Sequence, residues 1–122
     1  MLTLPQSVRI YVALDPVDMR KSHHGLAAIV RQLGLDPLSG HLVFFTNKRG
    51  NLAKIIFFDR TGLAILYKRL ESGTFQLPRV DDGQTRAEID PGSLAMILEG
   101  IDLRSAVRRK RYQRPQPPPA DL

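Results

Sequence analysis

The chain contains no cysteine. It therefore has no disulfide framework, no thiolate-bound metal and no cysteine nucleophile, and its composition is compatible with a reducing compartment. It also lacks any apolar run approaching the roughly 18 to 20 residues that a membrane helix needs. The first ten residues show no cationic stretch followed by a long apolar one, as an export signal would. We expect a soluble, cytoplasmic protein without a membrane partner.

Patterns typical of an active site are missing as well. No glycine-rich phosphate loop, nucleophile elbow or Ser-His-Asp arrangement is present. His23 and His24 are adjacent, so on a helix they project in different directions, unlike the i, i+4 pair of a zinc site. The sequence predicts a protein that is not an enzyme, with no catalytic residues, no metal site and no cofactor.

Four aspartates invite comparison with the metal-binding carboxylates of strand-transfer nucleases: Asp15, Asp18, Asp36 and Asp59. Local roles explain three of them better. Asp18 is placed to cap a helix, Asp36 precedes a proline in a turn, and Asp59 begins a tight turn. We therefore interpret these carboxylates as structural.

The net charge of +6 is distributed unevenly over 122 residues. Residues 20–69 hold nine cations against two acids, whereas residues 70–103 hold two cations against seven acids. From residue 104 onward there are six cations and one acid, and four prolines then favour an extended chain. This tail either tethers a polyanion or only neutralises the acidic segment and keeps the protein soluble.

Hydrophobic periodicity predicts an α+β domain over residues 1–103 and a basic, proline-rich, disordered tail over residues 104–122. One helix begins at Asp18 or Ser22 and ends at Gly34, and a second begins at Asp90 and ends at Gly100. We expect a mostly antiparallel sheet of four to six strands with two helices packed on one face. The strands are predicted at residues 8–14, 41–46, 53–59 and 63–70, with short ones at 74–77 and 86–89.

Two of these strands, residues 41–46 and 53–59, are apolar on both faces, whereas a half-exposed strand would alternate with polar residues. The second face is covered either by the segment 71–88 or by another subunit. A homo-oligomer is therefore left open.

Paired cations recur at the turns and strand ends. The turn between these two strands has the Asn47 and Gly50 that a hairpin needs, with Lys48 and Arg49 between them. Lys68 and Arg69 follow near the end of the next strand. A sheet with paired cations at its tips favours binding of a polyanion.

Several motifs in fixed order resemble the TnpB accessory protein of the bacterial insertion-sequence family sixty-six. They are VDMRK with GL within residues 17–26, DPLSGH at 36–41, FFTNKRG at 44–50, KIIFFD at 54–59, GL at 62–63, YKRLESGTF at 67–75 and LAMILEGIDL at 94–103. The family often has tryptophan where this chain has Phe57 and Phe58. The resemblance implies an accessory role in transposition of a mobile element.

We predict a non-enzymatic accessory protein that binds DNA through phosphates with little sequence readout, because no helix carries a cluster of base-reading side chains. The expected partners are DNA and the transposase of the same element. The alternative is a protein-interaction subunit that docks the transposase through an apolar sheet face. The predicted DNA-binding residues are Arg20, Lys21, Lys48, Arg49, Lys54, Lys68, Arg69, Arg104, Arg108, Arg109, Lys110, Arg111 and Arg114.

Overall fold

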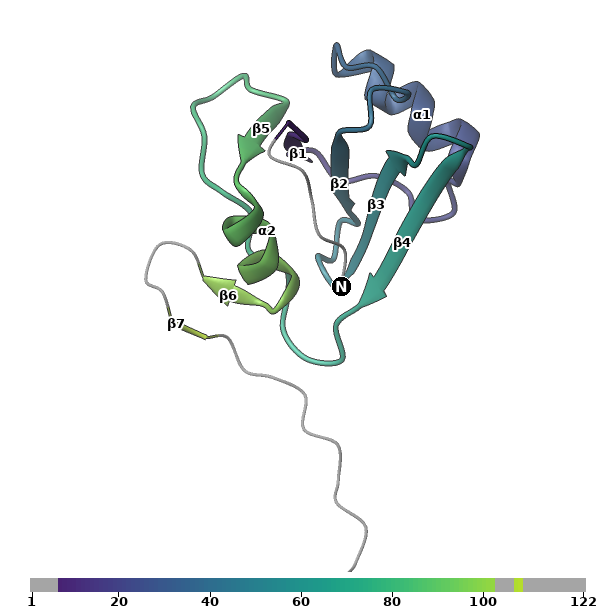
Figure 1. Ribbon diagram of the computed structural model, residues 1–122. Helices are drawn as coiled ribbons and strands as arrows, with labels where there is room; N and C mark the ends of the chain where they lie inside the picture. The colour runs from purple at the N-terminus through teal and green to yellow at the C-terminus, as the bar shows by residue number, and fades with distance from the viewer. Residues whose placement is uncertain (1–6, 103–106, 109–122) are drawn as a thin grey trace, which may run out of the picture.

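The computed structural model describes residues 7–102 and 107–108, which form an α+β fold (Figure 1). Five strands build one mixed sheet in the order β4-β3-β2-β1-β5. The strands are β1 Ile10–Ala13, β2 Leu42–Thr46, β3 Leu52–Phe58, β4 Leu63–Arg69 and β5 Arg86–Ile89. The helices are α1 His23–Gln32 and α2 Pro91–Leu98. A separate pair of strands consists of β6 Ile101–Asp102 and β7 Val107–Arg108. The predicted fold class is confirmed.

The order of the strands follows from their connections. β2, β3 and β4 are joined by short turns and pair antiparallel, and β5 pairs antiparallel with β1. β1 and β2 are parallel, because the chain returns through α1 before it enters β2. The sheet is therefore mostly antiparallel with one parallel pair at its centre.

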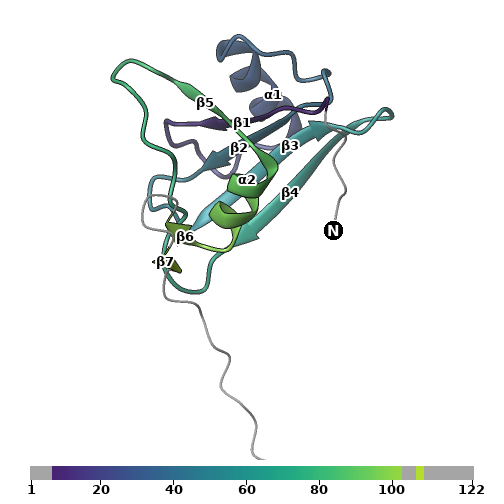
Figure 2. The same cartoon turned by 60° about the vertical axis from the view of Figure 1, so that its left-hand side comes forward.

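The two helices lie on opposite faces of the sheet, so the prediction that both pack on one face is wrong. Leu26 and Val30 of α1 pack with Phe45 and its face of the sheet. Leu94 and Ile97 of α2 pack with the face that carries Phe44, and α2 lies across the near side of the sheet in Figure 2. The physical reason is that β2 and β3 are apolar on both faces, and each face needs its own cover.

The segment between β4 and β5 completes the cover on the α2 side. Phe75 is buried against Phe44 with ring centroids 5.7 Å apart, and Leu70 and Leu77 pack on the same cluster. The predicted strand at 74–77 does not form, because this segment packs over the sheet instead of extending its edge. Of the two covers considered for the second face, the segment 71–88 therefore contributes, together with α2.

The helix ends agree with the sequence except at the start of α1. Gly34 follows α1 and Gly100 follows α2, both with the positive φ expected of a terminating glycine. The Asp90 side chain accepts a 2.7 Å hydrogen bond from the Ser93 N–H and caps α2. Ser22 is the N-cap residue of α1 without a side-chain hydrogen bond, and Asp18 instead closes a turn before the helix.

The predicted tail, residues 104–122, lies outside the described residues except for Val107 and Arg108. The backbone of these two residues forms β7, which pairs antiparallel with β6. The domain boundary at residue 103 therefore stays a prediction.

Candidate nucleic-acid interface

The turn that joins β2 to β3 is held by its own asparagines. The Asn47 side-chain oxygen accepts 3.0 Å hydrogen bonds from the N–H groups of Gly50 and Leu52, and the Asn47 amide donates to Asn51. Gly50 has a φ of +80°, which a residue with a side chain adopts only with strain. Lys48 and Arg49 are exposed and make no hydrogen bond or ion pair with the described part of the chain. No described residue therefore competes with a ligand for their cationic groups.

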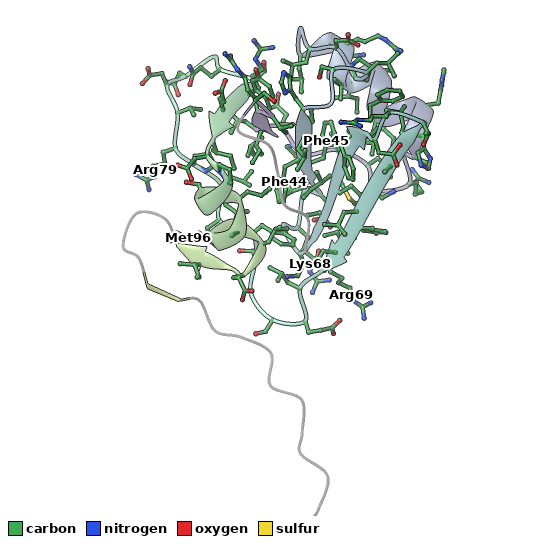
Figure 3. The ribbon with its side chains drawn as sticks, in the orientation of Figure 1. Phe44, Phe45, Lys68, Arg69, Arg79 and Met96 are labelled. Atoms are coloured by element: carbon green, nitrogen blue, oxygen red, sulfur yellow. The ribbon has the colours of Figure 1, made fainter. Side chains whose placement is uncertain are left out.

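The end of β4 lies beside this turn. The Leu70 N–H donates to the Asn51 carbonyl at 2.9 Å, and the Phe75 N–H donates to the Gly50 carbonyl at 2.8 Å. Arg69 projects outward at this end of the sheet (Figure 3). Arg49 and Arg69 line one open depression of about 560 Å³. We call Lys48, Arg49 and Arg69 the basic end of the sheet.

One acid opposes this charge. Glu71 lies in the same depression and accepts a hydrogen bond from the Arg69 guanidinium, Nε to Oε1, at 3.0 Å. The side chains are 66% and 48% exposed, so the pair is screened by water and contributes little to stability. An incoming phosphate can therefore replace the Glu71 carboxylate as the partner of Arg69 at small cost.

Lys54 is buried, unlike the other predicted DNA-binding residues that the structure describes. Its side chain is only 8% exposed, and its Nζ donates to the Met19 carbonyl at 2.8 Å and to the Lys21 carbonyl at 2.7 Å. The same ammonium lies 4.7 Å from the centre of the Tyr67 ring. Lys54 therefore fixes the chain that leads into α1, and the expectation that it faces a phosphate does not fit its position.

Two further cations hold helix ends. The Lys68 Nζ donates to the Leu98 carbonyl at 2.7 Å, at the C-terminus of α2. The Arg86 guanidinium donates to the Leu33 carbonyl at the end of α1 and lies 5.5 Å from the Tyr11 ring. A positive charge at a helix C-terminus is stabilising. Lys68 is therefore partly committed to the fold, although it adjoins the basic end.

The first predicted pair, Arg20 and Lys21, lies in the exposed chain before α1. Arg20 binds both carboxylate oxygens of Asp18, with the shortest contact at 2.7 Å. The hydrogen bonds from Arg20 lower the pKa of Asp18 to about 2. Lys21 is exposed, and its carbonyl is held by the buried Lys54. This places Lys21 on the α1 side of the sheet.

The side chains of the predicted tail cations lie outside the described part of the structure. Arg104, Arg109, Lys110, Arg111 and Arg114 lie outside the described residues, and only the backbone of Arg108 is described. Their contribution stays a prediction.

Three of the four aspartates bind backbone N–H groups within their own turns. Asp18 accepts from Arg20, Asp36 accepts from Leu38, and Asp59 accepts from both Thr61 and Gly62. The bonds from Thr61 and Gly62 lower the pKa of Asp59. No group of three or more potential metal-ligating side chains occurs within residues 7–102.

Tyr67 is not among the residues that the sequence predicts for the interface. Its ring is 53% exposed, and it lines a second open depression with Asn51, Leu52 and Arg69. The alternation of β4 indicates which face Tyr67 occupies, but its exposure depends on how much of that face α1 and the chain before it cover. The available signal was the adjacent sequence Tyr67-Lys68-Arg69, an aromatic residue beside two cations.

The chain is similar to known proteins over most of its length. The fold is a small α+β domain with a basic end, and residues 8–108 match the family described as IS66 Orf2 like protein. The chain belongs to this family, whose members are accessory proteins of insertion-sequence transposition.

Two relatives come from Sinorhizobium fredii. The uncharacterized protein y4hO is 38% identical over 105 residues, which cover 85% of this chain and 90% of the relative. The uncharacterized protein y4jC is 36% identical over 111 residues, which cover 90% of this chain and 92% of the relative. No solved structure matches the chain. Among the described residues, neither helix is long and apolar enough to cross a membrane.

Proposed function

We propose that this accessory protein acts in transposition by binding DNA through its phosphates, without catalysing a reaction itself. The observation that carries the proposal is the basic end of the sheet, where Lys48, Arg49 and Arg69 are exposed at adjoining turns. The Asn47 side chain stabilises the turn, so Lys48 and Arg49 are not required to hold it. Exposed cations without a structural role are the groups that phosphate binding requires.

The basic tail extends the proposed interface. Six of the chain's 18 cations lie after residue 103, and they add a second source of phosphate contacts. Contacts of this kind position a protein on DNA but read little sequence. We also propose that the protein binds DNA in the cytoplasm and that the element's transposase is its protein partner.

The alternative role, docking the transposase through an apolar sheet face, has less support. α1 covers one face of the sheet, and α2 with Phe75 covers the other. The apolar residues that suggested such docking are therefore used within the domain itself.

A gel-shift titration with a 25-base-pair duplex at several salt concentrations tests the proposal. One duplex carries an end of the element and another has an unrelated sequence. We expect similar affinities for both and a steep decrease with salt, because bound phosphates release counterions. The variant with Lys48→Ala and Arg49→Ala should bind more weakly while keeping its melting temperature. Absence of binding at low salt, or affinity that does not change with salt, would contradict the proposal.

A further inference from the structure

Tyr67 is an exposed aromatic residue on the edge strand of the sheet. β4 is the terminal strand of the sheet (Figure 1), and the Tyr67 side chain is 53% exposed on the α1 side of that edge. Ile65, two residues earlier on the same face, packs against the core cluster beneath α1. Tyr67 lies beyond that cluster, so core packing does not account for its ring.

The ring is held in place by a buried charge. The Lys54 Nζ lies 4.7 Å from the ring centre and is itself fixed by the carbonyls of Met19 and Lys21. An ammonium over an aromatic ring attracts it electrostatically. Because the cation is fixed, the ring is pre-organised, which lowers the entropic cost of binding a flat ligand.

A polar and cationic rim surrounds this ring. Tyr67 and Arg69 alternate along β4 and share one face, and Leu52 pairs with Arg69 on the neighbouring strand. Together with Asn51 they line an open depression of about 480 Å³. An aromatic ring next to a guanidinium is suited to a flat base attached to a phosphate.

This depression continues into the basic end. Asn51 and Arg69 also line the depression of the basic end, which reaches Arg49 and Thr74 around the end of the sheet. A chain of nucleotides that starts on Tyr67 therefore meets Arg69 and then Arg49. A duplex cannot use the ring in the same way, because its bases are already stacked on one another.

We propose that Tyr67, Arg69 and Arg49 form a binding site for unpaired DNA, in which a base stacks on Tyr67 and the adjoining phosphates contact the two arginines. The site rests on the proposed DNA-binding function and deepens it, because it selects single-stranded over duplex DNA. Any of the four bases fits such a ring, so little sequence preference is expected.

The first test uses fluorescence. The chain contains no tryptophan, so Tyr67→Trp introduces a single reporter into the full-length protein. Oligodeoxythymidylate of 15 nucleotides should quench this tryptophan as a base stacks on it. Leu66→Trp is the matched control, because Leu66 is similarly exposed, at 49%, but points to the opposite face of the same strand. Equal quenching of both variants, or of neither, would overturn the site.

The second test compares affinities by fluorescence anisotropy of labelled DNA. Tyr67→Leu should weaken binding of the 15-nucleotide strand about 10-fold or more, the scale of one lost base-aromatic stack, and leave duplex binding within about two-fold. Tyr67→Phe keeps the ring and should bind the strand as the parent does. Loss of binding in Tyr67→Phe, or an equal loss on duplex DNA in Tyr67→Leu, would contradict stacking.

These outcomes separate the site from the proposed function. A parent protein that binds duplex DNA with a steep salt dependence, but binds the single strand no more tightly, would overturn the site alone. A parent that binds neither form would overturn both. Tighter binding of oligouridylate than of oligodeoxythymidylate would overturn the assignment of the site to DNA.

Discussion

At the scale of single residues, Lys48 and Lys54 have the same side chain in different surroundings. Lys48 is exposed in a turn that Asn47 stabilises, whereas the Lys54 ammonium is buried on two main-chain carbonyls. The sequence predicts Lys48 in a turn and Lys54 within an apolar strand, but it does not show that the Lys54 side chain is covered. The sequence predicts Lys54 as a DNA-binding residue, and its strand is apolar on both faces. In such a strand, alternation does not show which side chains are covered.

The same substitution should lower stability at Lys54 and weaken DNA binding at Lys48. Lys54→Met leaves two carbonyls without their donor and should lower the free energy of unfolding by about 1–3 kcal/mol. It should leave the salt dependence of DNA binding unchanged. Lys48→Met, the matched control, should change stability by under about 0.5 kcal/mol and reduce the log-log salt slope by about 0.9. Urea unfolding and anisotropy titrations measure both, and a reduced slope in Lys54→Met would refute this assignment.

Glu71 is the acid within the basic end, so its removal should strengthen binding. Glu71→Gln keeps the size of the side chain but removes the charge that competes with phosphate for Arg69. We expect duplex affinity at low salt to rise about two- to five-fold, the scale of one exposed ion pair. Glu88→Gln is a suitable control. Glu88 lies on β5, at the other edge of the sheet, and pairs with Arg9. An equal rise in both variants would indicate only a general effect of net charge.

At the scale of the elements, the turn between β3 and β4 depends on one carboxylate. The Asp59 Oδ1 accepts hydrogen bonds from the Thr61 N–H, the Thr61 hydroxyl and the Gly62 N–H. These bonds lower the pKa of Asp59 in the folded state, and hydrogen bonding from Ser93 lowers the pKa of Asp90 in the same way. The β3–β4 turn and the start of α2 are therefore each stabilised by an ionised carboxylate.

The sign of the pH dependence follows from this lowering. Asp59 contributes stability that is present above its unfolded pKa of about 3.9 and is lost as the pH falls through the lower folded value. Asp59→Asn should therefore fold at pH 7 and lose less of its melting temperature than the parent between about pH 4 and pH 2. Asp82→Asn, in an exposed turn, should follow the parent. Circular dichroism melts across this pH range measure the effect. Identical melting temperatures for Asp59→Asn and the parent at every pH would contradict a stabilising role for the Asp59 carboxylate.

Local sequence chemistry predicts most of the elements, but their arrangement depends on long-range packing. Turn and capping residues such as Gly50 and Asp90 act within a few positions, so their roles could be read from the chain. The placement of α1 and α2 on opposite faces depends on contacts between residues far apart in sequence. The exposure of Tyr67 and the burial of Lys54 have the same origin, because the two side chains pair across strands that only the fold brings together.

At the scale of the whole molecule, charge separates into two basic regions and an acidic segment. The basic end gathers three exposed cations, and residues 104–122 carry six more. The Leu70 to Leu103 segment between them is acidic, which disfavours its own contact with phosphates. We therefore expect DNA to bind at the basic end and the tail together.

The salt dependence of duplex binding by a truncated chain tests this claim most directly. Ending the chain after Arg108 keeps the paired strands β6 and β7 and removes Arg109, Lys110, Arg111 and Arg114. The truncated protein should keep its melting temperature, bind more weakly, and lose about 0.9 from the log-log salt slope for each phosphate contact removed. Adding Lys48→Ala and Arg49→Ala should reduce the remaining slope again. A slope that neither change alters would contradict the account.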